Sequence, residues 1–254
     1  MKKIFFTLFL VLFSLPCFAE NAYNIVKQQY DMNKGFSDEK GIGKMIIKSP
    51  SGEQTEREFE YQQLEENGTQ GSKALIRIVK PANLAGTALL TYHNSNRDDD
   101  QWIYMPSFKK TNRIVGSAKR GNFIGSDFSF EDLAPKSIDD YTYTLVRDEP
   151  CGTTTCHVID SLPAKKGLSY SKITVWQRVD NAQNQRMELY DEKGQLIKTT
   201  TFEDYRQLGG KYWRPYSITM QNMVNKSSST LLVQSLNIAN GLKDSNFTQS
   251  VLER

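Results

Sequence analysis

The sequence is poor in the residues that most catalytic and metal sites use. It has two histidines and three cysteines among 254 residues. No serine stands in the glycine-flanked turn of a hydrolase nucleophile, and Gly125-Ser126-Asp127 lacks the second glycine. For His93 and His157 a structural role is the simpler interpretation. We therefore expect no catalytic residues, no metal site and no cofactor, and we predict that the protein is not an enzyme.

The sequence also lacks a strong excess of one charge and lacks a long apolar run. It carries 32 Lys and Arg against 29 Asp and Glu, a formal net charge of +3. The two signs are interspersed, so no electrostatic pattern favours nucleic-acid binding. The longest apolar run, Ile4 to Leu15, is shorter than the ~20 residues that a membrane-spanning helix needs. The composition thus points away from nucleic-acid-binding and membrane-spanning proteins.

Residues 1–19 have the pattern of a cleavable signal peptide. Lys2 and Lys3 precede the apolar run, and Ala19 is the small residue expected before the cut. A retained N-terminal anchor is the alternative. Cys17 lacks the aliphatic and small residues of a lipoprotein signal, because Ser14 and Pro16 hold those places. We therefore predict an unlipidated mature protein in the periplasm, with a net charge of +1 once the two lysines are removed.

The other two cysteines, Cys151 and Cys156, lie close together in an exported chain. Four residues separate them, whereas redox motifs have two and a zinc site needs further ligands. A local disulfide that stabilises a loop is the favoured interpretation, and a redox or metal site is the alternative.

The hydrophobic pattern predicts a mostly β protein. Ala22 to Asn33 has apolar residues near helical spacing, and after Gly35 the period changes to two. We expect about a dozen strands, at residues 43–49, 55–64, 73–80, 87–93, 101–105, 112–115, 140–148, 156–162, 171–179, 185–190, 195–205, 212–222 and 229–238.

Short turns between these strands predict an antiparallel meander, as in the hairpin around Gly194. A sheet of so many twisted strands tends to curl, so we expect a single domain, residues 20–254, built as an incomplete antiparallel β-barrel. Three pieces are not expected to be strands. They are the first helix, the region from Arg120 to Lys136, and a short C-terminal helix at Asn246–Glu253.

An acidic run, Asp98-Asp99-Asp100, follows Asn94-Ser95-Asn96-Arg97. Its oxygen atoms could bind a hard cation such as Ca²⁺. The run lacks the spaced acids and the glycine of an EF-hand loop, so a solvated hairpin tip is the favoured interpretation.

The segment from Gln101 to Leu133 combines an aromatic strand with a stretch punctuated by Gly116, Gly121 and Gly125. Its large apolar residues either fill the end of the barrel as core or form a movable lid over an apolar cavity, and the two interpretations are compatible. The candidate lipid-binding and lid residues are Trp102, Ile103, Tyr104, Met105, Ile114, Phe123, Phe128, Phe130 and Leu133.

With these residues the chain resembles the LolA/LolB-like outer-membrane lipoprotein-sorting proteins, in the branch with the TP-0789-type domain. The resemblance is based on Gln101 to Pro106, Arg113-Ile114, residues 116–133, Tyr212 to Pro215 and the final stretch from Phe247 to Leu252. It implies a LolA-like half-barrel around lid elements, with an apolar cavity that carries acyl chains across the periplasm. It also implies an inner-membrane partner of the RND/MMPL transporter type.

Three hypotheses follow. The first is a monomeric carrier of lipid or lipoprotein acyl chains that contacts membranes transiently. The second is a non-carrying accessory subunit of an envelope transporter, and the third is an enzyme acting on envelope lipid or glycan. The lid of the family's chaperone is latched by an arginine, for which Arg113 and Arg120 are the candidates here, and either could instead contact the partner.

Overall fold

The computed structural model describes residues 18–67, 71–95 and 97–253. The predicted leader therefore lies outside the described residues except at its last two positions. Within the described part, no helix combines the length and the hydropathy needed to cross a membrane. The helix and strands are α1 (Phe18–Met32), β1 (Asp38–Lys48), β2 (Gln54–Leu64), β3 (Lys73–Lys80), β4 (Ala88–Tyr92), β5 (Asp100–Met105), β6 (Lys110–Ile114), β7 (Tyr141–Cys151), β8 (Thr154–Pro163), β9 (Lys172–Arg178), β10 (Asn184–Tyr190), β11 (Leu196–Leu208), β12 (Tyr212–Asn222) and β13 (Ser228–Ile238).

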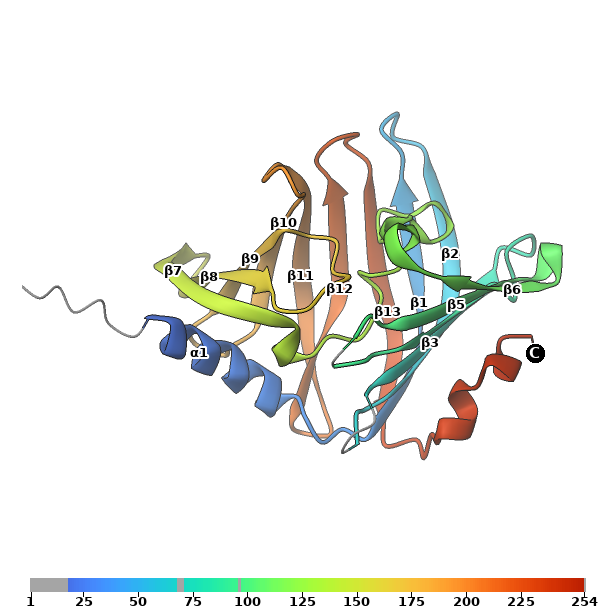
Figure 1. Cartoon of the computed structure of the whole chain (residues 1–254), viewed down its shortest axis with the longest axis horizontal. Coiled ribbons are helices and arrows are strands. Elements are labelled where there is room, and N and C mark those ends of the chain that lie inside the picture. Colours follow the sequence, from blue (N-terminus) through green and yellow to red (C-terminus); the bar gives the residue numbers. More distant parts are fainter. Residues whose placement is uncertain (1–17, 68–70, 96, 254) are drawn as a thin grey trace, which may run out of the picture.

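The strands form one thirteen-stranded sheet in the order β6-β5-β4-β3-β2-β1-β13-β12-β11-β10-β9-β8-β7. Every neighbouring pair is antiparallel, and β1 pairs with β13 to join the two halves of the chain. The sheet curls into an open cup whose edges are β6 and β7, with α1 running beside β7 and β8 (Figure 1). The predicted mostly-β architecture, an incomplete antiparallel barrel, is therefore confirmed.

Every predicted strand range contains a strand, because two-residue alternation and turn residues mark most of them. Gly194 adopts φ +74° in the turn between β10 and β11, the conformation for which glycine is favoured there. Helix α1 begins at Phe18, earlier than the predicted Ala22.

The predicted C-terminal helix at Asn246–Glu253 is wrong as a single helix. The tail forms two short 3₁₀ helices, η5 (Asp244–Phe247) and η6 (Gln249–Val251). Thr248 between them is extended, with φ −84° and ψ 157°. Its β-branched side chain favours that geometry over a helix.

The C-terminal tail covers the outer face of β3, β4 and β5. Phe247 and Leu252 are fully buried against Leu75 and Leu90. The guanidinium of Arg77 donates to the carbonyl oxygens of Val251 and Leu252, at 2.6 and 3.2 Å. Each of the two buried tail side chains contributes about 1.5–3 kcal/mol, which fixes the tail to the outside of the cup (Figure 1).

The chain between the two edge strands, residues 115–140, crosses the concave side of the cup, and we call it the lid segment. It contains three short 3₁₀ helices, η2 (Gly116–Arg120), η3 (Phe123–Gly125) and η4 (Ile138–Asp140), and one isolated bridge between Asn122 and Ser129. It holds no strand, as predicted for Arg120–Lys136, and its buried Phe123 packs against the sheet.

Candidate functional site

The four candidate residues of strand β5 alternate between the two faces of the sheet. Ile103 and Met105 belong to the cluster on the concave face. Trp102 and Tyr104 belong to the cluster on the outer face, under the C-terminal tail. The sequence pattern left this parity open, and the structure resolves it. Only Ile103 and Met105 of this group therefore face the side that the lid segment covers.

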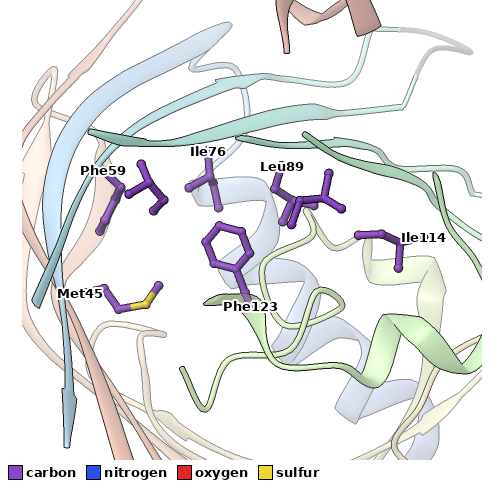
Figure 2. Packing of buried hydrophobic residues seen from close by; sticks show 8 residues of the cluster. Met45, Phe59, Ile76, Leu89, Ile114 and Phe123 are labelled. Atoms are coloured by element: carbon purple, nitrogen blue, oxygen red, sulfur yellow. The ribbon is translucent and has the colours of Figure 1, made fainter. Parts of the chain in front are cut away.

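Phe123 anchors the lid segment to the concave face. Its fully buried ring enters the cluster formed by β1 to β6, as Figure 2 shows, and lies near Ile76 and Leu89. The ring of Phe130 meets it edge to face, with centroids 6.0 Å apart. Ile114 and Leu133 contact the same cluster. These candidate residues are brought together as packed core between lid and sheet.

An open apolar cavity of about 430 Å³ lies on the other side of the lid segment, against β7 to β13. Phe128 and Leu133 of the lid segment line it, with Val26 and Tyr30 of α1. The sheet contributes alternate residues of successive strands. They are Tyr141, Tyr143, Ile173, Val175, Met187, Leu189, Thr200, Phe202, Ile218, Met220 and Leu231.

A second cavity, of about 270 Å³, lies against β1, β2 and β13. Its apolar lining includes Met45, Phe59 and Val233. The two cavities share four lining residues, Asp132, Leu133, Ile218 and Leu231. The lid segment therefore divides one concave apolar space into two adjoining chambers, each near or within the ~300–1,000 Å³ typical of ligand pockets.

A buried ion pair holds the lid segment between the chambers. Asp132 Oδ2 is 2.8 Å from Lys198 Nζ on β11, and its Oδ1 accepts from the Tyr170 hydroxyl at 2.8 Å. The backbone N–H of Ser129 also donates to Asp132 Oδ2. Burial and the Asp132 carboxylate raise the pKa of Tyr170 well above its ordinary value, so Tyr170 stays a neutral donor. The carboxylate is thus fully hydrogen-bonded, as a buried charge requires.

A second carboxylate, Asp127, ties the lid segment to β13. It accepts from the hydroxyls of Ser227 and Ser229, the latter at 2.7 Å, and its own N–H donates to the Ser229 oxygen at 2.8 Å. At the edge of the sheet, the Gln101 amide donates to the Phe130 carbonyl at 2.7 Å. Polar bonds thus fix the lid segment on both halves of the cup.

The two candidate latch arginines occupy the surface. Arg113 pairs with Asp100, and Arg120 pairs with Glu192 at 2.8 Å. Both guanidinium groups are more than half exposed. Arg120 does connect the lid segment to the β10–β11 turn, but an exposed pair contributes only about 0–1 kcal/mol. The structure thus places the buried tethers of the lid on Asp127 and Asp132, which carry no arginine partner.

Of the acidic run, Asp98 is exposed, as predicted for a solvated tip, but Asp99 and Asp100 are not. Asp100 is buried beside Arg97 and Arg113, and hydrogen bonds from these guanidinium groups lower its pKa to about 2. Asp99 lies 3.1 Å from the buried His93 ring and 3.4 Å from Lys165. The interpretation as a hairpin tip is therefore wrong for these two carboxylates, which form ion pairs instead.

His93 and Lys165 also contact Asp140 at the start of β7, at 3.7 and 2.7 Å. This buried cluster links the end of β4 to the opposite edge of the cup. In the part of the chain that the structure describes, no group of three or more His, Cys, Asp or Glu is arranged to hold a metal. We interpret this cluster as structural. The other histidine, His157, is half-buried, and its Nδ1 lies 2.6 Å from Asp148 Oδ1.

Cys151 and Cys156 form the predicted disulfide, with their Cα atoms 5.7 Å apart. The bond joins the end of β7 to β8 across their turn. Neither cysteine lines the apolar chambers. The disulfide therefore stabilises the turn between β7 and β8 and is not part of the candidate site.

Most of the chamber lining was not predicted from the sequence. The alternation of β9 to β13 shows that every second side chain shares a face, but both faces carry apolar or half-apolar residues. Val175 faces the chamber, whereas Trp176 packs beside Val158 and Cys156 on the other side. Only the direction of curvature decides which face becomes the cavity.

Comparisons with known proteins agree with this architecture. The model of a family of uncharacterized proteins matches residues 70–254. A solved structure described as an outer membrane lipoprotein-sorting protein domain, from Vibrio parahaemolyticus, is 32% identical, with a TM-score of 0.89 over 93% of this chain and 100% of that chain. A DUF1329 family protein from Desulfovibrio piger is 26% identical, with a TM-score of 0.88 and the same coverage. No curated protein matches the chain.

A LolA superfamily protein from Nitrosomonas europaea has the same fold. Its TM-score is 0.73 at 20% identity, over 93% of this chain and 100% of that chain.

Proposed function

The chain belongs to the outer-membrane lipoprotein-sorting proteins with the LolA-like fold, and on this premise we propose that it carries acyl chains in its two apolar chambers. The observation that carries the proposal is the pair of open apolar cavities between the sheet and the lid segment. Shielding an acyl chain from water is worth about 0.8 kcal/mol per CH₂. The chambers supply that shield without any chemical step.

The lid segment supplies the means of loading and release. Phe128 and Leu133 lie on the cavity side of this segment, while Asp127 and Asp132 hold it to β13 and β11. Displacing the segment would merge the chambers, since they already share residues below it. Side-chain bonds such as the Asp132–Lys198 pair hold the segment, so its displacement leaves the strand pairing of the sheet intact. Water hydrates the two charges once the segment is displaced, so they are not left buried and unpaired.

We further propose that the carrier works in the periplasm as an unlipidated monomer. The proposal rests on the signal-peptide pattern of residues 1–19 and on the mature domain, residues 20–254, without a lipoprotein signal. The cargo would be a lipid or the acyl chains of a lipoprotein. An inner-membrane transporter of the RND/MMPL type would hand over or accept it during transient membrane contact.

Substitution within the larger chamber tests the proposal. Val175 lines that chamber, so Val175→Trp is expected to weaken binding of a fluorescent fatty acid to the delipidated protein at least tenfold. Val179, half exposed just beyond the end of β9, provides the matched control, and Val179→Trp should leave binding unchanged. If Val175→Trp and Val179→Trp bind the fatty acid with equal affinity, the larger chamber is not the binding site. That result would favour the non-carrying accessory subunit.

A further inference from the structure

A third cavity, of about 230 Å³ and polar, lies where α1 ends beside β2 and β12. Lys34 and Glu66 form a 2.5 Å ion pair in its wall, and Arg214 pairs with Glu39 at 2.9 Å. Burial opposes the charged form of Lys34, yet the bonds to Glu66 and Tyr30 raise its pKa above the ordinary value. The Lys34–Glu66 pair therefore stays ionised. The lining is nearly balanced in charge, because Lys34, Lys136 and Arg214 face Glu39, Glu65 and Glu66.

This polar cavity meets both apolar chambers. It shares Gln29, Tyr30 and Lys136 with the larger chamber. It shares Glu39, Gln63 and Arg214 with the smaller chamber. Two apolar branches therefore diverge from one polar junction, on the two sides of the lid segment.

Another cavity of similar size does not have this position. It lies around Arg120 and Lys193, at the opposite end of the larger chamber. It shares only Tyr170 with that chamber and no residue with the smaller one. A ligand that starts there reaches a single branch.

The junction offers hydrogen-bond donors to an uncharged or phosphate-linked group. The ammonium of Lys136 donates to the carbonyl of Glu131 at 2.8 Å, and no carboxylate of the described residues pairs with it. Since an ammonium has three donors, two remain for a ligand. The oxygen of the Gln63 amide accepts from the Tyr61 hydroxyl. Its NH₂ group donates to no side chain or carbonyl of the described residues, so it can donate to an ester or phosphate oxygen.

We propose that the cargo has two acyl chains joined at one polar, glyceryl-type head, with one chain in each chamber and the head at this junction. The proposal rests on the proposed carrier function and specifies its ligand. A diacyl glycerophospholipid and a lipoprotein with a diacylglyceryl group share this chemistry. A single-chain lipid would leave one branch unfilled.

Titration of the delipidated mature protein tests the inference. The probes are a diacyl glycerophospholipid, the lysophospholipid with the same head, and a diacylated cysteinyl peptide, each competing with a fluorescent fatty acid. At least one two-chain ligand should bind one to one and at least tenfold more tightly than the lysophospholipid. Whichever two-chain ligand binds more tightly identifies the source of the cargo.

Two matched variants assign the branches. Val233→Trp, in the smaller chamber, should abolish the two-chain advantage, which is the tighter binding of a two-chain ligand relative to the lysophospholipid. The same variant should leave the affinity for lysophospholipid within twofold. Val175→Trp, in the larger chamber, should weaken the binding of both kinds of ligand. Val233→Met, a smaller change with less overpacking, should reduce the advantage in the same direction if the Trp variant folds poorly by circular dichroism. Lys136→Met should weaken two-chain binding at least threefold, and the exposed Lys193→Met should not.

Three results overturn the inference. They are equal affinity for one- and two-chain ligands, two lysophospholipids bound per protein, and an unchanged advantage in Val233→Trp. In each of these cases the protein still binds acyl chains, so the carrier function stands. Absence of binding to every probe would instead remove the carrier function, and with it the inference.

Discussion

Asp132 of the lid segment and Lys198 of β11 form an ion pair, 2.8 Å long, at the boundary between two apolar chambers. Both side chains are at most one-tenth exposed. A buried pair of this kind adds little stability over an apolar pair, but removal of one partner leaves an uncompensated charge. The pair therefore serves mainly to fix the position of the lid segment, and it adds little to the stability of the fold.

Asp132→Asn is expected to destabilise the protein by about 3 kcal/mol, because Lys198 would keep its charge in a buried site. Urea denaturation gives the loss, and hydrogen exchange should show faster opening of residues 115–140. Glu192→Gln, which breaks the exposed pair with Arg120, is the matched control and should cost less than about 1 kcal/mol. If Asp132→Asn and Lys198→Met are additive in a double-mutant cycle, the two residues do not act as a latch.

Phe123→Ala should destabilise the protein by about 3–5 kcal/mol, the usual cost of emptying a fully buried aromatic site. The control is Phe108→Ala in the turn between β5 and β6, where the ring is 71% exposed. That change should stay within about 0.5 kcal/mol. Similar losses in the two variants, measured by thermal unfolding, would mean that Phe123 does not anchor the lid.

Replacement of both Cys151 and Cys156 by Ser should lower the free energy of unfolding by about 2 kcal/mol, as chain-entropy arguments give for so short a loop. Fatty-acid affinity should not change, because the disulfide lies away from both chambers. A drop in affinity at a temperature where the variant is folded would show that the β7–β8 turn contributes to the site.

Asp100 should make the free energy of unfolding depend on pH in the acidic range. Arg97 and Arg113 hold its pKa at about 2, below the ~3.9 of an unfolded chain. Its contribution is thus present above about pH 4 and is lost as the pH falls towards 2. After screening at the exposed arginines we expect about 1 kcal/mol.

Asp100→Asn should therefore lose less stability than the wild type between pH 4.5 and pH 2.5, as measured by urea midpoints. Asp204→Asn, at an exposed pair with Arg206, is the control and should follow the wild type. Parallel pH profiles for wild type and Asp100→Asn would contradict the assignment.

The strands could be predicted from the sequence because each carries its own evidence. Alternation of polar and apolar residues and turn residues such as Gly194 act within ten residues or so. The C-terminal tail was harder, since Thr248 divides it into two turns whose side chains are fixed only by the outer face of β3 to β5. A local pattern cannot predict such distant contacts, for example that of Tyr92 with Phe247, 155 residues later in the chain.

The candidate site was predicted in part. The apolar residues of the lid segment were recognised, but their orientation was not, because Trp102 and Ile103 are equally apolar neighbours on opposite faces. Asp127 and Asp132 were not predicted, because no local pattern distinguishes a buried acid from a solvated one. Their partners Ser229 and Lys198 come from strands that only the curvature of the sheet brings to the lid.

Native mass spectrometry of the protein purified gently from the periplasm distinguishes a loaded carrier from a ligand-free accessory subunit. The carrier account predicts mass adducts that organic extraction identifies as acyl-chain lipids, and it predicts that Val175→Trp carries less of them than Val179→Trp. A ligand-free spectrum from a protein that still binds an envelope transporter would contradict it.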